Sequence, residues 1–240
     1  MKVNKIIFLL LILVSFISSC TTTRDTNFLQ NIPKDYKPAP EPDYRVIAGD
    51  QLRIKIFSLY GTLNDELGAF ADGGVLNIRQ DGTIKIPYLG KVYVEDLTLF
   101  EIGTLLTQKF EAIGEGVTAT VVLNNMYISL LGEMGTTRIA MPKPIMTIYE
   151  VMAMTTVPNL AGDRKKVTIL RQTKDGSVIK EFDIRTKDIV DSEFFYIQPN
   201  DVVYVAKSKK VFVGNGTNLG SSLGVITGVI GLVLMLVRLF

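Results

Sequence analysis

The side chains that most often carry out catalysis are scarce in this chain. Histidine is absent from all 240 residues, and Cys20 is the only cysteine. Without histidine there can be no Ser-His or Cys-His pair and no imidazole acid, base or metal ligand. A single cysteine also excludes a disulfide within the chain and a zinc site built from two or four cysteines. The candidates considered next for a chemical role are Cys20 and the carboxylates.

Cys20 follows a segment that is typical of a secreted bacterial protein. Lys2 and Lys5 precede an apolar run, from Ile6 to Ile17, that is shorter than the roughly 20 residues a membrane-spanning helix needs. The following Ser18-Ser19-Cys20 resembles a lipobox, where the signal is cut before the cysteine and the cysteine is acylated. We therefore expect a signal peptide at residues 1–19, a covalent lipid on Cys20 and no other cofactor. No aspartate follows Cys20 as an inner-membrane retention signal, which favours the outer membrane.

The carboxylates form no local constellation. A glycosidase would need two carboxylates at one site, but the acidic residues are spread along the chain as surface charge usually is. Gly49-Asp50, Asp81-Gly82 and Asp201 each stand before an apolar, strand-like run. We interpret them as structural turns in which the carboxylate accepts nearby backbone N–H groups. No catalytic residue, no metal site and no enzyme activity are therefore expected.

The charge balance argues against a nucleic-acid partner. The chain has 26 basic and 24 acidic residues. Loss of Lys2 and Lys5 with the signal would leave 24 of each, so no basic field remains to attract phosphates. With 47% hydrophobic residues the chain has enough apolar surface to fold.

The elements expected at residues 44–126 form a first small domain, after a proline-rich tether at residues 20–43. Leu52, Ile54 and Ile56 alternate with basic residues, as in a half-buried strand. The alternation recurs at 76–78 and at 84–86, on either side of Asp81-Gly82, which predicts a hairpin joining these two strands. Thr98 and Glu101 form a capping box that opens a helix through residue 110, ended by glycines at 114 and 116. A further strand is expected at 117–123.

Residues 127–213 are expected to form a second domain of the same kind. A second capping box at Thr147 and Glu150 opens a short helix, which Pro158 and Asn159 should close. Strands are expected at 128–131, 167–169, 178–184, 194–197, 202–205 and 211–213. Each domain would then be several strands with one helix on one face, so the fold class is α+β.

Residues 217–240 are expected to form a C-terminal transmembrane helix. From Leu219 onward the segment is apolar with one charged residue, Arg238, which could reach the membrane interface. Small and weakly polar residues recur on one side of the helix, as a helix-packing or pore-lining stripe: Thr217, Gly220, Ser221, Gly224, Thr227, Gly228 and Gly231. Such stripes permit close helix contact in lipid. A plain tail anchor is the alternative.

Together these motifs resemble the outer-membrane polysaccharide export family, the Wza-like capsule translocons. Tyr44-x-Val46-x-x-Gly49-Asp50 resembles the opening motif of its polysaccharide-export domain, and the run from Ile78 to Gly90 resembles its most recognisable one. Leu131-Gly132-Glu133 and the segment to Val203 resemble a SLBB domain, which has a β-grasp-like fold. The chain departs from the family at residues 134–138 and 155–162, and it has room for only one SLBB domain.

The resemblance implies a lipid-anchored outer-membrane protein with periplasmic domains. Its members form homo-oligomeric rings, often of eight, with a wall of C-terminal helices and capsular polysaccharide or exopolysaccharide in the lumen. The periplasmic end meets an inner-membrane co-polymerase, often a tyrosine kinase. Two alternatives stay open: a monomeric, lipid-anchored periplasmic SLBB binding module with a tail anchor, and a glycosidase acting on the exported polymer.

Overall fold

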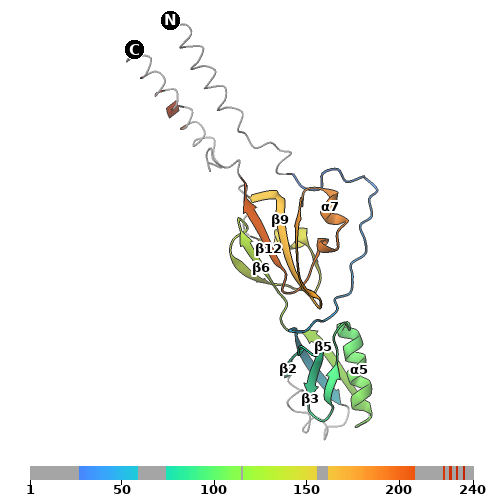
Figure 1. Ribbon diagram of the computed structural model, residues 1–240. Helices are drawn as coiled ribbons and strands as arrows, with labels where there is room; N and C mark the ends of the chain where they lie inside the picture. Colours follow the sequence, from blue (N-terminus) through green and yellow to red (C-terminus); the bar gives the residue numbers. More distant parts are fainter. Residues whose placement is uncertain are drawn as a thin grey trace.

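A computed structural model describes residues 27–58, 74–114, 116–155 and 162–208, together with Gly224, Thr227, Gly228, Gly231 and Met235. The described chain is a mixed α+β structure with two hydrophobic cores. We call the elements from β1 to β5 the first domain and those from β6 to β12 the second domain. Figure 1 shows the two domains stacked end to end.

Three antiparallel strands form the main sheet of the first domain. β1 (Gln51–Ser58) lies in the middle, between β2 (Gly74–Asn77) and β5 (Val117–Leu123). Alternate side chains of β1 and of β5 are buried, so the strands predicted from the period-2 patterns are confirmed. The exposed alternates of β1 include Lys55, which explains the basic residues between its buried leucine and isoleucines.

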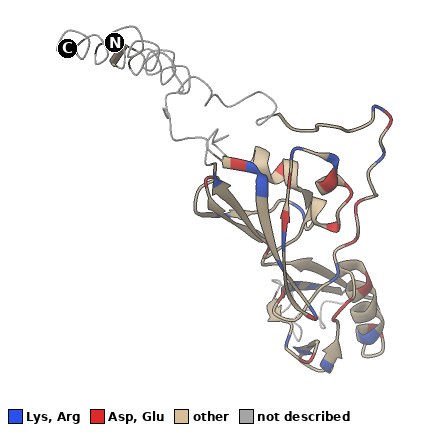
Figure 2. Ribbon diagram, turned by 45° about the horizontal axis from the view of Figure 1, so that its top comes forward, with Lys and Arg blue, Asp and Glu red and all other residues tan. Residues whose placement is uncertain are grey.

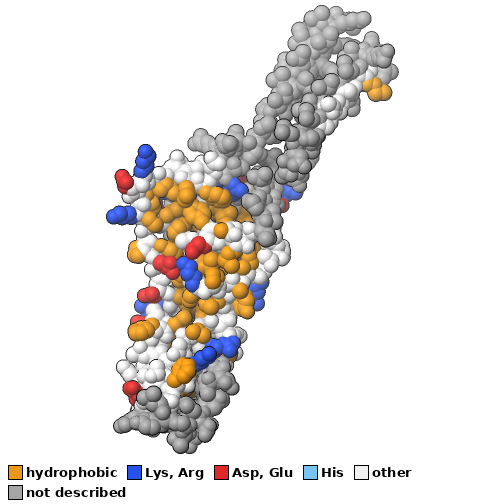
Figure 3. All heavy atoms as spheres, turned by 180° about the vertical axis from the view of Figure 1, so that it is seen from behind, with side chains coloured by type: hydrophobic (Ala, Val, Ile, Leu, Met, Phe, Trp, Pro, Cys, Tyr) orange, Lys and Arg blue, Asp and Glu red, His pale blue; other side chains and the backbone are white. Residues whose placement is uncertain are grey.

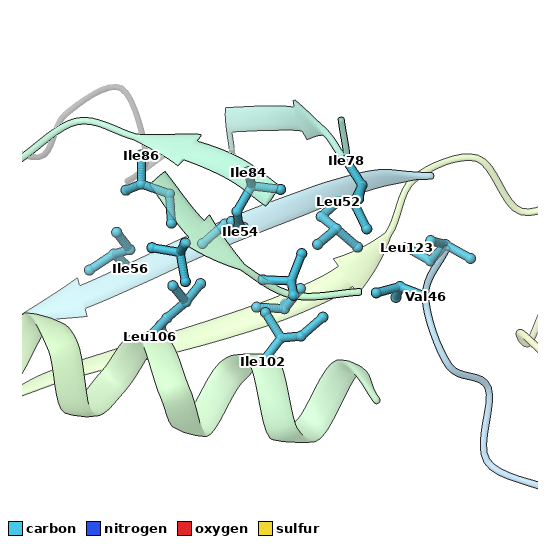
Figure 4. Close-up of a cluster of buried hydrophobic side chains, with 14 of the residues drawn as sticks. Val46, Leu52, Ile54, Ile56, Ile78, Ile84, Ile86, Ile102, Leu106 and Leu123 are labelled. Carbon is cyan, nitrogen blue, oxygen red and sulfur yellow. The ribbon is translucent and has the colours of Figure 1, made fainter. Parts of the chain in front are cut away.

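The helix α5 (Leu99–Glu111) packs against this sheet, and the predicted capping box is confirmed. The hydroxyl of Thr98 accepts the N–H of Glu101 at 3.2 Å, and the Glu101 carboxylate accepts the N–H of Thr98 at 2.7 Å. Figure 4 shows Ile102 and Leu106 pointing from the helix toward the apolar side chains of the strands. Each such buried side chain stabilises the fold by about 1.5–3 kcal/mol. The helix ends at Glu111, a little before the expected glycines.

The predicted hairpin around Asp81-Gly82 is wrong in its pairing. β2 pairs with β1, whereas β3 (Thr83–Ile86) pairs with β4 (Gly90–Tyr93). A tight turn does occur at Asp81-Gly82, because the Gly82 N–H donates to the carbonyl of Arg79 at 2.9 Å. The turn redirects the chain from one sheet to another instead of returning it alongside β2. The hairpin that does form consists of β3 and β4, and Pro87 to Leu89 connect its two strands.

The second domain is built on a five-stranded mixed sheet. The order is β10 (Gly176–Phe182), β9 (Gly162–Thr173), β12 (Val202–Lys207), β6 (Tyr127–Gly132) and β7 (Thr137–Ala140). β12 and β6 are parallel, and every other neighbouring pair is antiparallel. The first and last strands of the domain are thus neighbours at the centre of the sheet. Parallel neighbours need a crossover connection, and here the rest of the domain supplies it.

More than one helix contributes to the second core, so the expectation of a single helix is wrong for this domain. α6 (Ile148–Ala153), α7 (Lys187–Val190) and the 3₁₀ helix η1 (Glu193–Phe195) all bury side chains in it. The capping box of Thr147 and Glu150 is confirmed at the start of α6. A two-stranded sheet of β8 (Met146–Thr147) and β11 (Tyr196–Ile197) lies beside these helices.

Two of the strands predicted in this domain are corrected. Residues 193–195 form η1, and only Tyr196–Ile197 is a strand. A strand would have turned one of the adjacent Phe194 and Phe195 away from the core, whereas a helical turn buries both. β10 ends at Phe182, and Ile184 lies in the turn that follows. The expected helix end at 158–159 and the strand at 211–213 lie outside the described residues.

The described part of the expected tether, residues 27–43, packs on the second domain before it enters the first. The Gln30 N–H donates to the Arg185 carbonyl at 2.6 Å, and Tyr196 Oη donates to the Ala39 carbonyl at 2.6 Å. Tyr36 Oη donates to Asp191, next to α7. Figure 1 shows this blue segment running along the second domain toward the first. The tether therefore helps to cover the second core.

Among the described residues, no helix has the length and apolarity needed to cross a membrane. Most of the expected transmembrane helix, residues 217–240, lies outside those residues.

Candidate functional site at the junction of the two domains

A buried polar cluster lies where the two domains meet, and Asp50 is its centre on the first-domain side. Asp50 precedes β1 and is 1% exposed. Its Oδ2 accepts the Tyr44 hydroxyl at 2.6 Å and the Ile47 N–H at 3.1 Å. Gly49, one residue earlier, donates its N–H to the Ile78 carbonyl at 3.0 Å, which ties this turn to the strand end beside it.

The other carboxylate oxygen of Asp50 connects the domains. Oδ1 accepts the side-chain amides of Asn125 at 3.3 Å and of Asn200 at 3.4 Å. Asn125 lies in the link between β5 and β6, and Asn200 lies just before β12 of the second domain. Asn200 also donates its own N–H to the Tyr127 carbonyl at 2.6 Å. One carboxylate of the first domain thus contacts both the link and the second domain.

On the second-domain side of the cluster, Asp201 forms an ion pair with Arg171 of β9. The Arg171 guanidinium donates to Asp201 from Nε, at 3.1 and 3.2 Å to the two oxygens, and from Nη2 at 2.7 Å. Nη2 also donates to the Tyr196 carbonyl at 2.6 Å, and the guanidinium lies 4.6 Å from the Phe194 ring centroid. Asp201 further accepts the Gln198 N–H at 2.9 Å. A paired, bidentate geometry of this kind makes a strong buried ion pair.

Burial dominates the electrostatics of this cluster. Desolvation raises the pKa of Asp50, and the hydrogen bonds from Tyr44, Ile47 and Asn125 oppose the rise. Desolvation likewise raises the pKa of Asp201 against the opposing Arg171 charge, and it raises the pKa of Tyr44 well above its usual range. Both carboxylates are inaccessible to a polymer. The cluster is therefore suited to fixing the domains relative to each other.

The sequence pattern singled out Asp50 and Asp201 but missed the groups that complete the cluster. Their partners Tyr44, Arg171 and Asn200 come from three separate segments. The signal that could have found the arrangement is the echo between Gly49-Asp50 and Asn200-Asp201, each placed just before a strand. Within the described ranges, no three Asp, Glu, Cys or His side chains converge as metal ligands would.

We expect Tyr44→Phe to lower the free energy of unfolding at neutral pH by about 1–3 kcal/mol, because a buried acceptor loses its donor. Loss of that donor also raises the pKa of Asp50 further above its unfolded value. Protonation then favours the folded state, so the deficit should shrink as pH falls through the folded pKa toward the unfolded value. Urea denaturation of the full chain in mild detergent at two pH values measures this. Tyr204→Phe, at an exposed side chain of β12, is the control, and an equal loss in both variants would contradict the expectation.

The Asp81-Gly82 turn lies in the first domain, between β2 and β3, and is not part of the junction cluster. Asp81 accepts the Thr83 N–H at 3.2 Å, the Thr83 hydroxyl at 2.5 Å and the Lys91 ammonium at 3.0 Å. These bonds lower the pKa of Asp81 to about 2. Gly82 has φ +70°, and a Cβ there would lie 2.5 Å from the Tyr93 ring. Both the backbone conformation and the neighbouring ring therefore require glycine.

The sites expected at the two ends of the chain are only partly described. Cys20, Arg238, Thr217, Gly220 and Ser221 lie outside the described residues. The rest of the stripe, Gly224, Thr227, Gly228 and Gly231, has helical backbone and is exposed. A Cβ added to any of its three glycines would meet nothing within 4 Å. At these three glycines the described chain therefore leaves open space beside the helix backbone.

A pocket of about 390 Å³ opens on the second domain. Phe28 and Leu29 of the tether form part of its wall, opposite apolar side chains that include Tyr149 and Met152. The Phe28 and Tyr149 rings meet edge to face at 5.9 Å. Figure 3, the view from behind, shows hydrophobic side chains gathered on this domain. The tether thus packs against the second domain through aromatic contacts as well as hydrogen bonds.

Comparison with known proteins identifies the first domain. Residues 38–124 match the family described as polysaccharide biosynthesis/export protein. The match begins in the tether and ends after β5, so it covers the sheet, hairpin and helix of the first domain and every buried residue of the first core except Ile145. No curated protein matches the chain. The matched family is one of export rather than of catalysis, and it points to the cell envelope. The chain therefore carries a domain of the polysaccharide biosynthesis/export family, which supports a role in polysaccharide export.

Proposed function

We propose that this protein is an outer-membrane lipoprotein that assembles into a channel for the export of capsular polysaccharide or exopolysaccharide, and that it is not an enzyme. The observation that carries the proposal is the match of residues 38–124, which span the first core, to the export family. The buried junction supports it, because a channel subunit must hold its domains in one relative orientation to form a regular ring.

The second domain supports a SLBB-type, β-grasp-like assignment. Its first strand, β6, and its last strand, β12, are parallel neighbours at the centre of a five-stranded sheet. α6, α7 and η1 bury side chains in the same core as that sheet. This arrangement supports the proposal that residues 127–213 form a SLBB domain.

Membrane attachment is proposed at both ends of the chain. Lipid on Cys20 would anchor the protein, since acylation places long apolar chains in the bilayer. Residues 217–240 would form the transmembrane helix, with Arg238 at the interface. The stripe that includes Gly224, Gly228 and Gly231 would let neighbouring helices approach closely. A ring of such helices is the proposed wall of the channel in the outer membrane.

The proposed partners follow from this assembly. The protein would form a homo-oligomeric ring, octameric in keeping with the family, with polysaccharide in its lumen. An inner-membrane co-polymerase, of the kind that is often a tyrosine kinase, would meet the periplasmic end of the ring. No nucleic-acid partner is proposed.

The test is the native mass of the complex in mild detergent, for the full chain and for a truncation that ends at Asn215. We expect a large ring for the full chain and a smaller or dissociating species for the truncation, because the helices would contribute much of the subunit contact. The control replaces residues 217–240 by an unrelated apolar helix without the stripe.

Each outcome distinguishes the competing functions. A stable ring that needs the native helix supports the channel. A monomer in all three cases would break the channel proposal and favour the lipid-anchored binding module instead. Turnover of polysaccharide by the purified protein would favour the glycosidase, which otherwise lacks support.

A further inference from the structure

The β3–β4 hairpin of the first domain has a polar outer face. Ile84, Ile86 and Val92 point inward and are buried. The alternate positions, Lys85 and Lys91 among them, are exposed to solvent. Figure 1 shows the hairpin in the first domain, and none of the hydrogen bonds to the Asp50 or Asp201 carboxylate comes from it. Its outer face is therefore not part of the junction cluster.

Two lysines stand directly opposite each other on this face. Lys85 and Lys91 are cross-strand partners in the hairpin. Like charges at such positions repel and destabilise a sheet. Asp81 offsets part of this charge, because it accepts the Lys91 ammonium at 3.0 Å. Lys85 has no ion pair among the described residues. The face thus carries a cationic group that an anionic ligand would neutralise.

Tyr93 supplies an aromatic surface on the same face. It is the cross-strand partner of Thr83 and is 58% exposed. Its ring lies against Gly82, where an added Cβ would be 2.5 Å away, and its hydroxyl is 3.4 Å from a Glu95 oxygen. The backbone of the turn thus supports the ring from one side. An exposed, supported ring can pack against the apolar C–H face of a sugar.

The charges around Tyr93 are of both signs. Arg79, Lys85 and Lys91 are exposed basic residues near the turn and hairpin, and Asp81, Glu95 and Asp96 are the carboxylates in the same segment. Figure 2 shows that basic and acidic residues are interspersed over both domains. On the outer face of β3 and β4 themselves, the charged residues are Lys85 and Lys91, and both are basic. Carboxylates beside an aromatic ring can accept sugar hydroxyls, while the lysines favour a sugar carboxylate.

We propose that the outer face of this hairpin binds the exported polymer, and that the polymer is an acidic polysaccharide. Tyr93 packs against a sugar ring, and Lys85 with Lys91 binds a carboxylate of the same or the adjacent sugar. Binding of the carboxylate relieves the repulsion between the two lysines. The inference rests on the proposed export function and adds to it the chemical class of the polymer and its contact site.

The experiment measures the affinity of the full chain, in mild detergent, for polygalacturonate, an acidic polymer, and for dextran, a neutral one. We expect binding to polygalacturonate that weakens with salt, and no comparable binding to dextran. The double variant Lys85→Gln, Lys91→Gln should lose about tenfold or more in affinity, because two charge-assisted contacts are removed. Tyr93→Leu should lose affinity as well. Lys55→Gln on the exposed side of β1 is the matched control and should be unchanged.

The native mass of each variant is measured beside its affinity, so that this inference and the proposed channel can fail separately. A ring that stays intact while the hairpin variants bind polygalacturonate as well as the wild type does would overturn the site and leave the channel standing. Equal binding of dextran would overturn the acidic specificity. Well-folded hairpin variants that no longer form the ring would show that this face contacts a neighbouring subunit, which also overturns the inference.

Discussion

Replacing Arg171 by methionine should destabilise the second domain by about 3–5 kcal/mol at neutral pH, the cost of leaving a buried charge without its partner. Asp201 is 1% exposed and takes two nitrogens of the guanidinium. The variant also loses the bond to the Tyr196 carbonyl, at 2.6 Å, and the contact with the Phe194 ring. Urea denaturation of the full chain in mild detergent, followed by far-UV circular dichroism, measures the change.

The pH dependence identifies the unpaired carboxylate as the cause. Burial already raises the pKa of Asp201, and Arg171 opposes that rise. Without Arg171 the folded pKa moves further above the unfolded one, so the folded state gains relative stability by binding a proton. The loss of unfolding free energy in Arg171→Met should be largest above the folded pKa of Asp201, and it should shrink as pH falls toward the unfolded pKa. Arg171→Met combined with Asp201→Asn should recover part of the loss. A deficit that does not change with pH would contradict this explanation.

Gly132→Ala should cost about 2–4 kcal/mol, because it combines backbone strain with a steric clash. Gly132 ends β6 with φ +84°, where an added Cβ would lie 2.2 Å from the backbone carbonyl oxygen of Val205 on β12. Backbone cannot move aside as a side chain can. The next residue, Glu133, donates its N–H to that same carbonyl at 2.9 Å, so the approach of the two strands is also held by a hydrogen bond.

Gly135→Ala is the control for this prediction. Gly135 has a similar φ of +96°, but an added Cβ would meet nothing within 4 Å. Its substitution should cost only the strain, about 1–2 kcal/mol. The difference between the two variants therefore isolates the close approach of β6 to β12. Equal losses in the two thermal or urea unfolding experiments would show that strain alone accounts for the glycine at position 132.

Local patterns in the sequence were sufficient where the determining interactions are local. The capping boxes at Thr98 and Thr147 join residues three positions apart, and both are present as predicted. The alternation of Leu52, Ile54 and Ile56 predicted β1, because burial on one face of a sheet requires that period. The resemblance at residues 44–90 was also readable from the sequence, and the family match confirms it.

Strand pairing was decided by tertiary structure. Asp81-Gly82 does form a turn, yet the partners of β2 and β3 lie elsewhere, in β1 and β4. A turn motif specifies the backbone over a few residues only, whereas the pairing depends on which distant strands compete for the same edge. The adjacent Phe194 and Phe195 show the same limit, since burial of both favoured a 3₁₀ turn over the predicted strand.

The sequence by itself determined the absence of histidine chemistry, the single cysteine at position 20, the apolar C-terminal segment and the turn-forming aspartates. Only the tertiary structure decided that Asp50 and Asp201 form one buried junction between the two domains. Asp50 accepts a hydrogen bond from Asn200 of the second domain, and Asp201 is paired with Arg171. The hydrogen bonds that join them span 30 to 150 residues. No local pattern encodes such contacts, because they exist only once two separately packed cores have come together and excluded water between them.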